Sequence, residues 1–128
     1  MPKSTFLRNR VLDCVFNGAT LSVATAYASL HAADPGLTGA SEIAAGANAY
    51  ARQAVSMGPA SAGALASDAV LTWANTPDVT ITHVGVWDAA TGGNFLYSLP
   101  LSPPTTTKNL DPGDTFTIPV SNLNVSES

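Results

Sequence analysis

The sequence predicts an all-β fold: a β-sandwich or jelly-roll-like domain of about seven short antiparallel strands, preceded by one N-terminal amphipathic helix. One observation behind this prediction is a series of short runs rich in β-branched and aromatic residues. Turn signals such as Asp34-Pro35-Gly36 and Asp111-Pro112-Gly113 separate these runs. A helical spacing of apolar residues is confined to the start of the chain. With 128 residues, we expect a helical arm over residues 1–18 and one sandwich domain over residues 19–128.

The helix is expected from about Thr5 to Asn17, between an N-cap at Ser4 and a C-terminal cap at Gly18. Its apolar stripe is Leu7, Val11, Cys14 and Val15, with Phe6, Leu12 and Phe16 beside it. Because a helix this short is marginal alone, the stripe must pack against something. Two interpretations are open: packing on its own domain, or docking on another subunit as an arm. The docking interpretation predicts a partner-binding set of Lys3, Leu7, Arg8, Arg10 and Val11.

Three short strands are expected before the centre of the chain. The first covers residues 24–31, where side chains alternate between two faces. The second covers residues 50–57, and the third covers residues 69–74 with Leu71 and Trp73 on one face. The loop over residues 37–49 is long for a compact domain, so we expect it to serve a contact.

A hairpin over residues 80–101 is the expected centre of the fold. Its turn, residues 89–94, contains paired glycines. Alternation predicts one face with Ile81, His83, Gly85 and Trp87, and in the return strand one face with Phe95, Tyr97, Leu99 and Leu101. Both faces of the hairpin are mostly apolar, which is typical of a central strand pair. A later strand carries Phe116, Ile118 and Val120, and a short one contains Leu123 and Val125. The predicted core anchors are Trp73, Trp87, Phe95 and Phe116.

Composition and charge exclude several classes of protein. Charged residues make up only 11% of the chain, against about 25% in ordinary soluble domains, and the net charge is −4. Lys3, Arg8 and Arg10 are three of the five basic residues, so no basic stripe for nucleic acid is expected beyond this segment. No apolar run is long enough to cross a membrane. The single cysteine, Cys14, cannot form an internal disulfide, which is typical of a protein made in a reducing cytoplasm.

The chain carries no strong pattern for catalysis or for a bound cofactor. His31 and His83 lie on expected strands without the three or four convergent ligands that a metal needs, so neither a metal nor another cofactor is expected. There is no Gly-x-Ser-x-Gly motif, and most of the acidic residues fall in turns. We therefore expect no enzyme. Sugar stacking is the alternative binding chemistry, through Tyr27, Tyr50, Trp73, Trp87 and Tyr97.

Three motifs occur in order along the chain. They are Tyr27-x-Ser29-Leu30-His31-x-Ala33-Asp34-Pro35-Gly36-x-Thr38-Gly39, then Tyr50-Ala51-Arg52-Gln53-Ala54-Val55, then Thr82-His83-Val84-Gly85-Val86-Trp87-Asp88-Ala89-Ala90-Thr91-Gly92-Gly93-x-Phe95-Leu96. The set resembles a family of small virion structural proteins of tailed bacteriophages, often labelled phage tail fibre or structural protein. The similarity runs from about residue 5 to residue 125.

The resemblance implies a non-catalytic virion subunit that is assembled in the host cytoplasm and binds other virion proteins of the capsid or tail. Two roles are open: a decoration or cement protein on the capsid, and a fibre or adaptor protein at the tail. The weakly charged surface suits a symmetric homo-oligomer such as a trimer. The alternative function is a carbohydrate-binding β-sandwich module used in host attachment.

Overall fold

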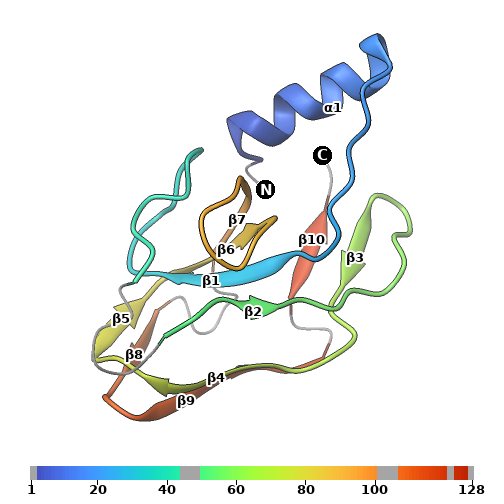
Figure 1. Cartoon of the computed structure of the whole chain (residues 1–128). Helices are drawn as coiled ribbons and strands as arrows, with labels where there is room; N and C mark the ends of the chain where they lie inside the picture. The colour runs from blue at the N-terminus through green and yellow to red at the C-terminus, as the bar shows by residue number, and fades with distance from the viewer. Residues whose placement is uncertain (1–2, 44–49, 101–106, 121–122, 127–128) are drawn as a thin grey trace.

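The computed structural model describes residues 3–43, 50–100, 107–120 and 123–126 (Figure 1). These residues form one helix and ten short strands, and every strand pairing is antiparallel. The elements are α1 (Thr5–Asn17), β1 (Tyr27–His31), β2 (Gln53–Ala54), β3 (Ala64–Ala66), β4 (Leu71–Thr76), β5 (Val79–Ile81), β6 (His83–Trp87), β7 (Phe95–Pro100), β8 (Lys108–Leu110), β9 (Asp114–Ile118) and β10 (Asn124–Ser126). The predicted all-β, sandwich-like fold is confirmed. Leu101 and residues 44–49 of the expected contact loop lie outside the described ranges.

The strands form two layers. One layer is a four-stranded sheet with the order β2-β1-β6-β7. The β4–β9 ribbon lies across from this sheet, with β5–β8 at one end and β3–β10 at the other (Figure 1). The space between the layers contains the main hydrophobic core.

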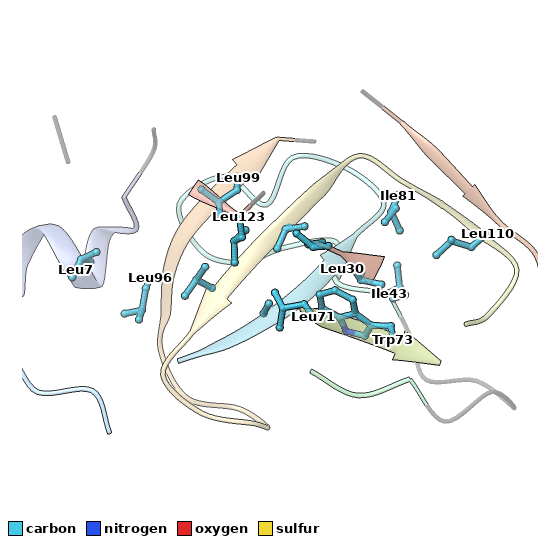
Figure 2. Packing of buried hydrophobic residues seen from close by; sticks show 14 residues of the cluster. Leu7, Leu30, Ile43, Leu71, Trp73, Ile81, Leu96, Leu99, Leu110 and Leu123 are labelled. Atoms are coloured by element: carbon cyan, nitrogen blue, oxygen red, sulfur yellow. The ribbon is translucent and has the colours of Figure 1, made fainter. Parts of the chain in front are cut away.

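The core forms because each layer directs alternate apolar side chains inward. In β4, Leu71 and Trp73 are buried while Thr72 between them is exposed. In the four-stranded sheet, Leu30 of β1 pairs with Val84 of β6, and both side chains are buried. Figure 2 shows the cluster extending from the layers to Leu7 of the helix, which points toward Leu96 of β7.

The structure corrects the expected hairpin in two places. The first strand breaks at Thr82: Ile81 in β5 pairs with β8, whereas His83 in β6 pairs with β1. A bulge in β7 also shifts the register, because Tyr97 pairs with Val86 and Phe95 with Trp87. Since a bulge inserts one extra residue, Phe95 lies on the opposite face of the sheet from Tyr97 and Leu99. Alternation counted along the sequence cannot show either break.

The helix has the predicted bounds. The hydroxyl of Ser4 accepts a hydrogen bond from the backbone N–H of Leu7 (3.0 Å), and Gly18 caps the other end with φ = 69°. The residues before the helix lie along β7: Lys3 bridges to Tyr97, and the N–H of Ser4 donates to the carbonyl of Leu96 (2.8 Å). The start of α1 is therefore fixed to the edge of the sheet.

The turn before β3 holds a strained residue. Ser61 and Ala64 exchange two backbone hydrogen bonds of 2.8 and 3.0 Å, so the turn has two central residues, Ala62 and Gly63. Both have positive φ, 52° and 77°, which is the geometry that favours Asn-Gly. An alanine in this conformation carries steric strain.

We expect Ala62→Asn to stabilise the protein by about 1 kcal/mol, because asparagine tolerates the left-handed conformation better than alanine. Urea unfolding measures the change in the free energy of unfolding. The control is Ala33→Asn, at an exposed position with ordinary φ, which should not stabilise. A gain of the same size in both variants would contradict the strain at Ala62.

Candidate functional site

Residues of the three sequence motifs meet on one face of the four-stranded sheet, the face turned away from the main core. Register places Tyr27 opposite Trp87, Ser29 opposite Gly85, and His31 opposite His83. The loop after β1 covers the strand edge beside them: Ala32 N–H donates to the carbonyl of Ser41, and Ile43 N–H to that of Leu30. Side chains from three distant parts of the sequence therefore share one site.

A chain of hydrogen bonds connects Trp87, Ser29 and His31. The indole N–H of Trp87 donates to Ser29 Oγ (2.8 Å), and Ser29 Oγ lies 2.6 Å from His31 Nε2. His31 Nδ1 lies 2.8 Å from the carbonyl oxygen of Ala40. Since a carbonyl only accepts, Nδ1 carries the proton, and Nε2 then accepts the hydroxyl proton of Ser29. This arrangement satisfies every polar atom of the chain when the imidazole is neutral.

Burial supports the neutral form of His31. Its side chain is 0% exposed, and burial lowers its pKa although the Ala40 carbonyl and the Glu42 carboxylate act in the opposite direction. The ring also lies 6.2 Å from that of Phe95, between ring centroids. The imidazole is thus held on all sides as a neutral structural group.

The pair of Ser29 and His31 has the residue types of a nucleophile and its base. However, Ser29 and His31 are both 0% exposed, and Ser29 Oγ already contacts both Trp87 and His31. A substrate cannot reach the hydroxyl in this conformation. The geometry therefore suits a structural link between β1, β6 and the covering loop.

A second network surrounds Arg52, whose side chain is only 8% exposed. Its Nε and one terminal nitrogen donate to the two carboxylate oxygens of Glu42, each at 2.9 Å. Tyr50 donates its hydroxyl to the same carboxylate (2.9 Å) and accepts the N–H of Leu30 (3.0 Å). Burial alone would raise the pKa of Glu42, but the hydrogen bonds from Arg52 and Tyr50 outweigh it and hold that pKa below its usual value. Burial raises the pKa of Tyr50 far above its usual range.

Arg52 also connects this network to the hairpin between β6 and β7. Its remaining terminal nitrogen donates to the carbonyls of Ala89 (3.0 Å) and Gly92 (2.8 Å). The guanidinium lies 3.8 Å from the centroid of the Trp87 ring, a cation–π contact. The same indole packs edge-on against Phe95, with ring centroids 5.1 Å apart. One arginine thus links the covering loop, the hairpin turn and the aromatic pair.

Two glycines allow this close packing. A Cβ atom on Gly39 would lie 2.6 Å from the Trp87 ring, and one on Gly85 would lie 2.5 Å from His31 Nε2 and 2.6 Å from Ser29 Oγ. Any other residue at these positions would displace the network. The packing of this site explains why Gly39 and Gly85 of the motifs are glycines.

The four predicted core anchors divide between two clusters. Trp73 is buried in the main core, where its ring lies 5.8 Å from that of Phe116, which is partly buried. Phe95 is buried and Trp87 half-buried, but both belong to the polar network on the other face of the sheet. The bulge in β7 turns Phe95 toward Trp87 and away from the main core.

The predicted partner-binding residues do not form one surface. Leu7 is buried, and Val11 packs against the same core. Lys3 bridges to β7, and Arg10 donates to the carbonyl of Thr20 (2.8 Å). Arg8 is exposed. The stripe with Leu7 and Val11 therefore faces the chain's own domain.

The exposed apolar surface of the helix is formed by other residues. Leu12, Val15 and Phe16 are 56%, 67% and 76% exposed. Their spacing of three and four residues places them together, and we call them the outward face of α1. The sequence does show apolar residues on more than one side of this helix. The stripe expected to pack contained Val15 but neither Leu12 nor Phe16.

The aromatic residues considered for sugar stacking offer no open ring platform at the two tryptophans. Trp73 is buried, and Arg52 covers the Trp87 ring. Tyr50 is engaged with Glu42 and Leu30. The register does bring His31 and His83 opposite each other, which the sequence spacing did not indicate. Nevertheless, the described ranges contain no group of three potential metal ligands, and their one helix is too short to span a bilayer.

We expect the stability of the protein to fall as the pH decreases below about 6.5, the pKa of an unfolded histidine. Because the folded-state pKa of His31 is lowered, the unfolded chain binds more protons in this range. The loss deepens below about 4.5 as Glu42 titrates, since its folded-state pKa is lowered too. Urea unfolding across pH 4 to 8 measures the effect. His31→Gln should remove the dependence near pH 6, and a dependence that persists in this variant would contradict the assignment to His31.

We expect Arg52→Ala to destabilise the protein by about 3 kcal/mol, the lower end of the cost of breaking a buried ion pair, because Glu42 keeps some contact with water. Arg52→Lys should recover only part of this loss, since lysine cannot make the two-pronged contact or stack as a plane on Trp87. Lys108→Ala, at an exposed position, is the control and should change stability by less than about 0.5 kcal/mol. If Arg52→Lys unfolds with the wild-type free energy, the positive charge alone would account for the stabilisation, which would contradict the role of the planar guanidinium.

Comparison with known proteins supplies the family. A family model described as podophage GP4 fiber I protein gp80 matches residues 2–126. A search of curated proteins found no match. The family match covers all three motifs, whose residues build the buried network described above. The chain therefore belongs to the podophage GP4 fiber I protein gp80 family, a family of virion structural proteins of tailed bacteriophages.

Proposed function

We propose that the chain is a non-catalytic structural subunit of a podophage tail fibre, attached within the virion through the outward face of α1. The fibre role in this proposal is supported by the description of the matching family as a podophage fiber protein. The burial of Ser29 and His31 supports a non-catalytic role, because the most enzyme-like pair of the described residues is inaccessible.

The distribution of exposed apolar residues carries the proposal. Among the described residues, five of the eight large apolar side chains that are exposed fall within residues 12–23. They are the three of the outward face, followed by Leu21 and Val23 in the segment after the helix. Contiguous apolar surface of this kind marks sites of protein–protein contact, whereas scattered single residues do not.

The helix is also presented in a fixed position. Leu7 and Ser4 hold its start against β7. Arg10 donates to the carbonyl of Thr20, and Ala19 N–H donates to that of Asp13 (3.1 Å), which ties down the segment that leaves the helix. In Figure 1, α1 lies outside the strands, and this segment returns to β1. A partner therefore meets a preformed helix and little ordering entropy is lost on binding.

We expect the double variant Leu12→Ser/Phe16→Ser to fold normally but to be missing from virions, because its apolar contact is lost. Phage assembled with each variant can be labelled with a gold-conjugated antibody to the protein and viewed by electron microscopy. The wild type should label at the tail. The matched control, Val70→Ser/Val120→Ser, removes two exposed apolar residues elsewhere and should still be incorporated.

Urea unfolding of the purified variants confirms that both fold. Label over the heads would replace the fibre role with a capsid decoration role. Incorporation of the outward-face variant at the wild-type level would show that α1 is not the point of attachment.

A further inference from the structure

A second apolar surface lies on the body of the protein. A pocket of about 220 Å³ is lined by Ala60, Gly63, Ala64, Leu65, Tyr97 and Val125. These residues come from the strained turn, β3, β7 and β10. A dry cavity of roughly 150 Å³ accepts benzene in another protein, so this pocket has room for the phenyl ring of a phenylalanine.

We propose that this pocket accepts Phe16, together with its neighbours on the outward face of α1, from a second copy of the same chain. The inference rests on the proposed function in one respect, namely that the outward face is a docking surface. It adds the identity of the acceptor. Phe16 is 76% exposed in its own chain, so it does not fill its own pocket and is free to enter that of a neighbour.

Charge favours another copy as the occupant. Residues 3–18, which contain the helix, carry Lys3, Arg8 and Arg10 against a single acidic residue, Asp13. Residues 19–126 carry two basic and seven acidic side chains, and one of the basic residues, Arg52, is committed to Glu42. The arm of one copy is thus attracted to the body of the next. Two arms packed side by side and parallel would instead place their Arg8 residues, one turn before Leu12, close together.

The contact joins two different surfaces, so it is heterologous. Such contacts form a closed ring if the rotation between copies closes, and an open filament if it does not. A closed ring such as a trimer gives each copy one donated helix and one filled pocket. Because three side chains make a small interface, closure of the ring would add the stability that a single contact lacks.

Sedimentation of the full-length protein tests the proposal. We expect the wild type to associate with increasing concentration, and Phe16→Ala to weaken association about tenfold or more, as truncation of a central aromatic anchor does. Ala60→Lys fills the pocket and adds a positive charge facing the basic arm, so it should weaken association equally. The controls are Val70→Ala and Ala33→Lys, at exposed positions that belong neither to the pocket lining nor to the helix, and they should associate like the wild type.

Mixing the two variants gives the decisive measurement. Phe16→Ala retains its pocket and Ala60→Lys retains its helix, so an equimolar mixture should form a one-to-one complex and nothing larger. A wild type that stays monomeric, while virion incorporation still depends on the outward face, would overturn the self-docking proposal and leave the proposed function standing. Association that depends on Phe16 but not on Ala60 would also overturn it, in favour of helix-to-helix contact. If Phe16 variants both associate and enter virions like the wild type, both proposals are wrong.

Discussion

The buried guanidinium of Arg52 is the contact on which the polar side of the sheet depends. Its carboxylate partner comes from the loop after β1, its carbonyl partners come from the β6–β7 turn, and the ring beneath it comes from β6. These partners lie up to 40 residues from Arg52 along the chain. A desolvated arginine is costly unless its donors are satisfied, so the surrounding chain must adopt one arrangement. This constraint explains why Glu42, Tyr50 and the hairpin turn keep fixed positions.

The four-stranded sheet therefore separates two kinds of interior. Its inner face packs leucine, valine and alanine side chains against β4 and β9, where shape complementarity is the main requirement. Its outer face holds the chain of Trp87, Ser29 and His31, where each donor needs a specific acceptor. Hydrophobic packing tolerates exchange of similar side chains, whereas a satisfied polar network does not. The motifs supply both faces: Leu30, Val84 and Val86 pack in the core, and Ser29, His31 and Trp87 form the network.

The fold class and the helix were predictable from the sequence because both depend on local signals. Ser4, Gly18 and the spacing between them determine where α1 begins and ends. The break at Thr82 and the bulge in β7 were not predictable, because they depend on which strands are neighbours. The same holds for the site: Ser29 and Arg52 occur in the sequence motifs without an expected role and Glu42 in none, and only the tertiary register brings them together. The apolar residues of the outward face of α1 were visible in the sequence beside the stripe. Their spacing does not reveal which side of the helix packs against the strands.

The backbone pairing of Lys3 and Ser4 with β7 has a consequence for contact between chains. An open strand edge offers unpaired N–H and C=O groups to any other chain and so promotes uncontrolled sheet growth. Lys3 and Ser4 cover part of one edge of the four-stranded sheet, and Glu42 and Ile43 cover part of β1 near the other. The described chain thus covers part of β7 and the end of β1 that β2 leaves unpaired. Where the edge is covered, contact with another chain depends on side chains, which specify a partner and a stoichiometry in a way that exposed backbone does not.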